Sequence, residues 1–138
     1  MANYRSAADF GDVSAHVALD ERHLRVMTLG DQSLEREVLQ VFVRQISLML
    51  NRIARAEPAH AAAAAHTLKG SALGLGAWRV AEAAERVEQA ASGLGNLGDA
   101  IAELNIAASE VRGAIEARLQ GVGAEFSALY GHVSVYSA

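Results

Sequence analysis

The segment His66-Thr67-Leu68-Lys69-Gly70-Ser71-Ala72 lies inside an alanine-rich stretch that predicts one long helix over residues 59–75. At about 100° per residue, His66 lies about 140° and Gly70 about 180° from the centre of the apolar face of this helix. The face itself is expected to pack inward and consists of Ala61, Ala65, Leu68, Ala72 and Leu75. The periodicity therefore predicts an imidazole that points outward from a helical core.

Two residues that follow His66 on its side of the helix, Lys69 and Gly70, determine the surroundings of the imidazole. Gly70, one turn later, has no side chain to cover the ring, so another molecule can reach a ring nitrogen. Lys69 places a cation beside the ring, where it would interact favourably with the negative charge of a phosphoryl group. A lone histidine is usually only a surface or core residue, a lone lysine is usually just solvated, and a lone glycine can serve close helix packing. The three together are more specific, and an exposed imidazole is substantially neutral and nucleophilic near pH 7.

The composition predicts an all-α domain. The chain has 138 residues, enough for one hydrophobic core, and 51% of them are hydrophobic while only 5% are aromatic. Much of the apolar share is alanine, which favours closely packed helices. The one proline, Pro58, suits the first turn of the 59–75 helix, where its missing N–H has no helical partner.

Helical periodicity extends on both sides of this central helix. Before it, we expect a short helix over 19–29 that Gly30 ends, and a longer one to about residue 56 capped by Asp31 or Ser33. The inward residues of the longer helix are predicted to be Leu34, Val38, Phe42, Ile46, Met49 and Ile53.

Two further helices are expected after the central one. The first covers 78–92, and the last begins near a cap at Asp99 and is closed by Gly121 and Gly123. Their inward residues are predicted to be Val80, Ala84, Val87 and Ala91, then Ile101, Leu104, Ala108, Val111, Ile115 and Leu119.

These elements predict an antiparallel up-and-down four-helix bundle with a short extra N-terminal helix. The bundle is expected to occupy residues 19–120, after an N-terminal arm over 1–18. The tail over 121–138 is apolar enough that we expect it to dock on the bundle.

The segment 66–72, followed by Gly76-Ala77, resembles the motif of the histidine phosphotransfer (HPt) family: histidine, any residue, leucine, lysine, glycine and two small residues, with a later glycine-alanine. The similarity covers about residues 19–120. In the neighbouring helices it is carried by Leu29-Gly30-Asp31, Leu34, Glu37, Leu39, Phe42, Ala84 and Val87-Glu88.

The resemblance implies that His66 accepts a phosphoryl group from the phosphoaspartate of a response-regulator receiver domain and passes it to another receiver. Lys69 then gives electrostatic support and Gly70 steric access. Family members often have a polar residue on the next helix that hydrogen-bonds the other nitrogen of the imidazole. The matching position here is Glu88, and Gln89 is the nearby alternative. The domain would need no cofactor, since the receiver supplies the magnesium ion and the aspartate, and the chain would carry phosphate rather than act as an enzyme with turnover.

Charge and hydropathy exclude other classes of partner. The formal net charge is -4 and there is no basic run, so nucleic-acid binding is not expected. No stretch reaches the roughly 18 apolar residues that span a bilayer, and there is no cysteine, so we expect a cytoplasmic protein. Its expected partners are receiver domains and a sensor or hybrid histidine kinase, and a monomer suits a carrier that docks with them in turn.

Two rival interpretations remain. One is a non-catalytic module that keeps the HPt fold and binds receivers or kinases without phosphotransfer. The other is a metal-binding bundle, for which Glu57 and His60 form one Glu-x-x-His pair, broken by Pro58. His60 and His66 are six residues apart and do not form the i, i+4 pair of a helical zinc site. No catalytic triad or P-loop is present, so hydrolysis and ATP binding are not expected.

Overall fold

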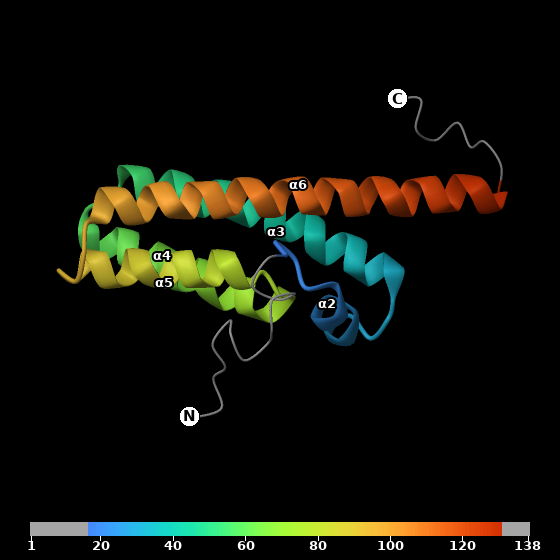
Figure 1. Ribbon diagram of the computed structural model, residues 1–138, viewed down its shortest axis with the longest axis horizontal. Coiled ribbons are helices and arrows are strands. Elements are labelled where there is room, and N and C mark those ends of the chain that lie inside the picture. Colours follow the sequence, from blue (N-terminus) through green and yellow to red (C-terminus); the bar gives the residue numbers. More distant parts are fainter. Residues whose placement is uncertain (1–16, 131–138) are drawn as a thin grey trace.

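The structure, a computed structural model, describes the backbone of residues 17–130 and the side chains of residues 17–121. Every regular element in this range is a helix (Figure 1). The helices are α2 (Glu21–Met27), α3 (Gln32–Arg55), α4 (Pro58–Leu75), α5 (Trp78–Ala91) and α6 (Leu97–Tyr130). Most of the expected arm, residues 1–16, and the end of the expected tail, residues 131–138, lie outside the described residues.

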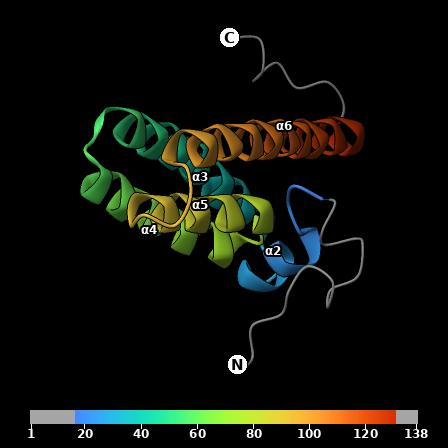
Figure 2. The ribbon, with the colours of Figure 1, turned by 60° about the vertical axis from the view of Figure 1, so that its left-hand side comes forward.

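Helices α3 to α6 form an antiparallel bundle, as predicted. In two views, α3 and α6 form one layer and α4 and α5 the other, with α2 at one end of the α4–α5 layer (Figures 1 and 2). The α4–α5 pair packs most extensively, followed by α5–α6 and α3–α4, and α3–α6 contacts close the bundle. The connections are short, which makes helices that follow each other antiparallel neighbours.

The core combines a few large side chains with many alanines. Phe42, Leu68, Leu104 and Ile115 are almost completely buried, and each such side chain contributes roughly 1.5–3 kcal/mol to stability. Small residues fill the space between them, and they belong mostly to α4 and α5: Ala61, Ala64, Ala65, Ala72, Ala81, Ala83, Ala84 and Ala90. The inward face predicted for α4 is therefore confirmed.

The start of α3 differs from the prediction. Asp31, not Ser33, caps the helix, because its carboxylate accepts a hydrogen bond from the Leu34 backbone N–H at 3.0 Å. Leu34 is exposed, and Glu35 is buried in its place. The burial of a charged residue here is explained by Arg118 of α6, whose guanidinium donates to both carboxylate oxygens of Glu35 at 2.7 and 3.1 Å.

The two ends of α6 also differ from the prediction. Asn96 rather than Asp99 caps the start, since the Asn96 side chain accepts from the Asp99 backbone N–H at 2.8 Å. The helix does not end at Gly121 and Gly123 but continues to Tyr130, beyond the start of α3 in Figure 1. Glycine ends a helix when it adopts a left-handed conformation, and no positive φ is found at Gly121. The predicted docking of the tail depends on side chains that lie outside the described residues.

The short α2 is two residues shorter at each end than the predicted 19–29 helix. Asp20 caps its start, and Thr28 follows its last turn and is buried. Leu29 and Gly30 then both adopt positive φ, 56° and 73°, which turns the chain into α3. At α5, Ala90 is buried while the predicted Ala91 is half-buried.

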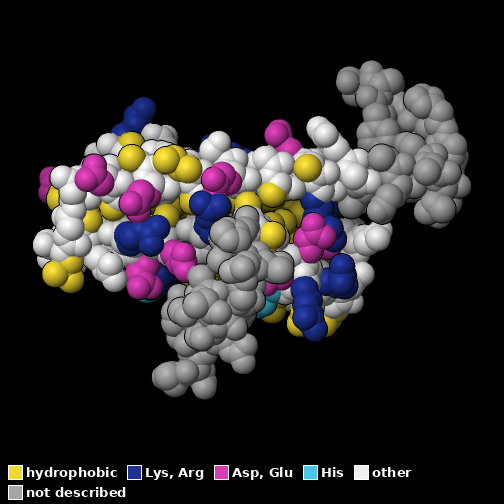
Figure 3. Space-filling view, viewed as in Figure 1, with side chains coloured by type: hydrophobic (Ala, Val, Ile, Leu, Met, Phe, Trp, Pro, Cys, Tyr) yellow, Lys and Arg dark blue, Asp and Glu magenta, His cyan; other side chains and the backbone are white. Residues whose placement is uncertain are grey.

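Charged side chains of both signs are spread over the face that α5 and α6 present in Figure 3. They form pairs between the two helices, Arg79 with Glu110 at 3.0 Å and Arg86 with Glu103 at 2.7 Å. Exposed pairs of this kind contribute little to stability and mark a solvated face. Within the described range, no helix is long and apolar enough to cross a membrane.

Candidate functional site

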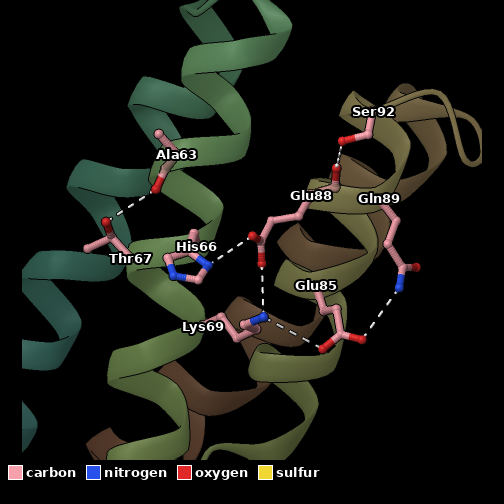
Figure 4. Close-up of polar contacts among 8 residues, drawn as sticks. All are labelled: Ala63, His66, Thr67, Lys69, Glu85, Glu88, Gln89 and Ser92. Atoms are coloured by element: carbon pink, nitrogen blue, oxygen red, sulfur yellow. Dashed lines mark hydrogen bonds and ion pairs between the residues drawn. The ribbon is translucent and has the colours of Figure 1, made fainter.

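His66 lies near the middle of α4 and points away from the core. Its side chain is 69% exposed, as the helical periodicity predicts. Nδ1 of the ring lies 2.9 Å from Oε2 of Glu88, which reaches across from α5 (Figure 4). The structure thus brings together two residues that are 22 positions apart in the sequence.

The contact with Glu88 distinguishes the two nitrogens of the ring. An ionised carboxylate only accepts hydrogen bonds, so the hydrogen of the neutral imidazole lies on Nδ1. Nε2 then carries the lone pair, and among the described residues no hydrogen-bond partner is found for it. The nitrogen with the lone pair is therefore the one that Glu88 leaves free, on a side chain that is mostly exposed.

Lys69 is held by the same carboxylate. Its Nζ lies 3.2 Å from Oε1 of Glu88 and 3.7 Å from Oε1 of Glu85. Glu88 consequently bridges His66 and Lys69 with its two oxygens, and its side chain is only 24% exposed. The ammonium lies within the site, one helical turn from the imidazole.

Gln89, the alternative partner for the imidazole, does not contact His66. Its amide nitrogen lies 3.4 Å from Oε2 of Glu85 instead (Figure 4). Glu85 itself was not anticipated, although a signal was present: it lies three residues before Glu88 and so shares its face of α5. Of the two candidates on α5, Glu88 makes the contact.

The surface beyond His66 is open at Gly70. A Cβ built on this glycine would meet nothing within 4 Å, so packing within the chain does not require a glycine there. Glycine inside a helix is less stable than alanine by roughly 0.5–1 kcal/mol. The fold alone therefore does not account for a glycine at this position.

An apolar groove of about 380 Å³ lies farther along α4, where α2, α3 and α4 meet. Gly74, which lines it, is two helical turns from His66, about 12 Å along the helix. Half-exposed side chains such as Met27 and Val41, 53% and 49% exposed, form its rim. The remaining lining includes Thr28, Glu37, Val38, Phe42, Gln45, Ser71 and Leu75.

The Glu57 and His60 pair lies at the exposed start of α4, and Glu57 is the residue before the helix begins. Within the described residues, no group of three or more histidine, cysteine or acidic side chains is arranged to hold a metal ion. The pair therefore gains no third ligand from that part of the chain.

Comparison with protein families adds one finding to this geometry. The family model of the Hpt domain matches residues 36–124, more than half of the chain. No curated protein and no solved structure gives a significant match. The matched segment contains His66, Lys69, Gly70 and Glu88. The chain therefore belongs to the Hpt domain family, the histidine phosphotransfer domains that carry phosphoryl groups in two-component phosphorelays.

Proposed function

We propose that this protein relays a phosphoryl group between the aspartates of receiver domains through Nε2 of His66. The observation that carries the proposal is the 2.9 Å contact between Nδ1 of His66 and Glu88, which leaves the exposed Nε2 as the nucleophile. A histidine that served only as a surface residue would need no such orienting partner.

In the proposed step, the lone pair of Nε2 attacks the phosphorus atom of a receiver's phosphoaspartate. The N–P bond forms as the bond between phosphorus and the aspartate oxygen breaks, and the receiver's carboxylate leaves with the electron pair. The hydrogen on Nδ1 stays in place, so the ring becomes positively charged. Glu88 stabilises this charge because its carboxylate already accepts the Nδ1–H. Transfer to a second receiver reverses the same step.

Lys69 would act on the phosphoryl group rather than on the ring. Its ammonium is held near His66 by two carboxylates, Glu88 and Glu85, and so is available close to the arriving negative charge. A positive charge placed where negative charge develops favours transfer in both directions. Lys69 is thus proposed as electrostatic support.

The partner is proposed to dock over Gly70 and the apolar groove between α2, α3 and α4. The open space above Gly70 admits a close approach to His66, and the groove offers half-exposed apolar side chains farther along α4. Buried apolar contact surrounded by polar residues is typical of protein interfaces. The receiver is proposed to bring the aspartate and its magnesium ion, and a sensor or hybrid histidine kinase to act upstream.

The test is transfer of labelled phosphoryl groups from purified receiver domains, phosphorylated with labelled acetyl phosphate, to the intact protein. We expect label on the wild type and none on His66→Gln. His60→Gln is the matched control, since His60 is an exposed histidine on the same helix, and it should accept label like the wild type. Label on His66→Gln would overturn the proposal, and receiver binding without any transfer would favour a non-catalytic interaction module.

A further inference from the structure

The groove beside the site has one wall that is weakly attached by apolar contacts. That wall is α2, which contributes Met27, while Thr28 follows directly after it. Leu24 is the buried residue within this seven-residue helix, whereas Val26 and Met27 are 66% and 53% exposed. A helix so short is unstable alone, so its position depends on specific contacts with the bundle.

The strongest of these contacts converge on Asp20, the residue that caps α2. Its Oδ2 accepts a hydrogen bond from Nε1 of Trp78, the first residue of α5, at 3.0 Å. Its Oδ1 accepts from the His23 backbone N–H at 3.0 Å, and its own N–H donates to the carbonyl of Gly76 at 2.9 Å. One residue therefore joins the start of α2 to the turn between α4 and α5.

His23 makes a second connection, directly to the groove. Its Nε2 lies 3.1 Å from the carbonyl oxygen of Gly74, a residue that lines the groove on α4. Its ring also lies edge-on to Trp78, with the centroids 4.9 Å apart. A further contact, the ion pair of Glu21 with Arg118, is exposed on the glutamate side and so contributes less.

The turn that receives α2 is shaped for this close approach. Gly76 adopts φ 90°, and a Cβ placed on it would lie 3.1 Å from Asp20 Cβ and 3.2 Å from His23 Cβ. A side chain at this position would therefore push α2 away from the turn.

From these contacts we infer that the Asp20–Trp78 hydrogen bond, supported by His23, fixes α2 as a wall of the groove and thereby sets the affinity for a docking receiver domain. Asp20, His23 and Trp78 are positioning residues in this scheme, because none of them has a described contact with His66 or Glu88. The inference rests on the proposed function, since it concerns how the receiver is bound.

The Asp20–Trp78 hydrogen bond is called the clamp below. The substitution Asp20→Ser removes the clamp but keeps the helix cap. Serine caps a helix about as well as aspartate, so α2 keeps its first-turn hydrogen bond but loses the acceptor for Trp78. Trp78→Phe removes the same bond from the other side and keeps an aromatic ring. Glu103→Gln, which breaks an exposed pair between α5 and α6, is the matched control.

Three measurements on the intact protein test the inference. Hydrogen exchange of the peptide covering residues 17–30 reports whether α2 stays docked. A single round of transfer from a phosphorylated receiver, measured over a range of receiver concentrations, gives the half-saturating concentration (KM) and the limiting rate constant (kcat). Phosphorylation of His66 by phosphoramidate, a small donor that needs no docking surface, reports the chemistry of the site.

For Asp20→Ser and Trp78→Phe we expect faster exchange in α2 and a rise in KM of roughly three- to tenfold, the range for one lost hydrogen bond. The kcat and the phosphoramidate rate should stay within about twofold of the wild type. The double variant should be no worse than either single variant, because all three lack one and the same bond. Glu103→Gln should match the wild type throughout.

The inference is overturned if α2 exchanges faster while KM is unchanged, if exchange is unchanged, or if the two substitutions have additive effects. Failure of the proposed function looks different, because the wild type itself would then take no phosphoryl group from any receiver. A fall in the phosphoramidate rate would also count against the inference, since it would place the clamp in the chemistry instead of in docking.

Discussion

Glu88 holds Nδ1 of His66 at 2.9 Å across the α4–α5 interface, and its other oxygen lies 3.2 Å from the Lys69 ammonium. A single carboxylate thus orients the imidazole and positions the cation. Any change at Glu88 is expected to affect both groups.

Replacing Glu88 with glutamine should slow phosphorylation of His66 by phosphoramidate about five- to tenfold. The amide oxygen still accepts the Nδ1–H, but the hydrogen bond loses its charge, and charged hydrogen bonds are stronger than neutral ones by about 1 kcal/mol. Glu88→Ala should be slower again. Glu103→Gln is the control, because it neutralises an exposed glutamate of α6 and leaves the His66 contact intact. An unchanged rate in Glu88→Gln would show that the carboxylate does not support the nucleophile.

Replacing Gly70 with alanine should stabilise the protein and impair it at the same time. The added methyl meets nothing within 4 Å, so the free energy of unfolding should rise by roughly 0.5–1 kcal/mol. Transfer from a phosphorylated receiver should slow, because the methyl lies where the partner approaches. Gly113→Ala, on α6 and equally unobstructed, should raise stability without slowing transfer. Equal transfer rates in the two variants would show that Gly70 has no steric role in transfer.

Replacing Gly76 with alanine should destabilise the protein more than replacing Gly93. Both glycines adopt positive φ, 90° and 98°, so both substitutions incur backbone strain of roughly 1–3 kcal/mol. Only at Gly76 does the new Cβ also crowd Asp20 and His23. The difference between the two unfolding free energies, measured by chemical denaturation, isolates the steric part. Equal values would mean that α2 moves aside without loss.

Acidification should release α2 from the turn. Burial alone would raise the pKa of the Asp20 carboxyl, but hydrogen bonds from the His23 backbone and the Trp78 ring, with charge on His23, hold the pKa below its ordinary 3.8. A carboxyl whose pKa is lowered by folding contributes stability above its unfolded pKa, and this is lost as the pH falls through the folded value. We therefore expect the change below pH 3.8.

Tryptophan fluorescence is a direct measure of this release, because Trp78 is the one tryptophan in the sequence and donates to Asp20. The emission of the wild type should change on acidification below that pH. In Asp20→Ser the same change should be absent or much smaller. An identical titration in both proteins would assign the effect to other carboxyls.

Local patterns were sufficient to predict the bundle. The buried residues of α4, such as Leu68 and Ala72, recur at helical spacing, and Pro58 marks the start of that helix. At the start of α3, where the predicted inward residue was wrong, a contact distant in sequence decided the outcome. Glu35 is buried instead of Leu34 because Arg118, 83 residues away, supplies a bidentate partner.

The candidate site divides in the same way. The outward direction of His66 follows from the helix alone, whereas the choice of Glu88 over Gln89 depends on how α5 is rotated against α4. The clamp on α2 had no local signal, because Asp20 and Trp78 are 58 residues apart and meet only at the turn after α4. Periodicity locates faces, but it does not show which polar side chains from different helices meet.

The alanines buried on α4 and α5 carry no functional group, yet they affect how closely the two helices of the site pack. The distance between packed helix axes, commonly 8–10 Å, depends on the size of the side chains between them. Small residues such as Ala65 and Ala84 let α5 lie close enough for a glutamate to touch an imidazole on α4. These alanines therefore act as a spacer: a larger residue in either position would widen the gap and leave the histidine without its carboxylate, with every residue of the site still present.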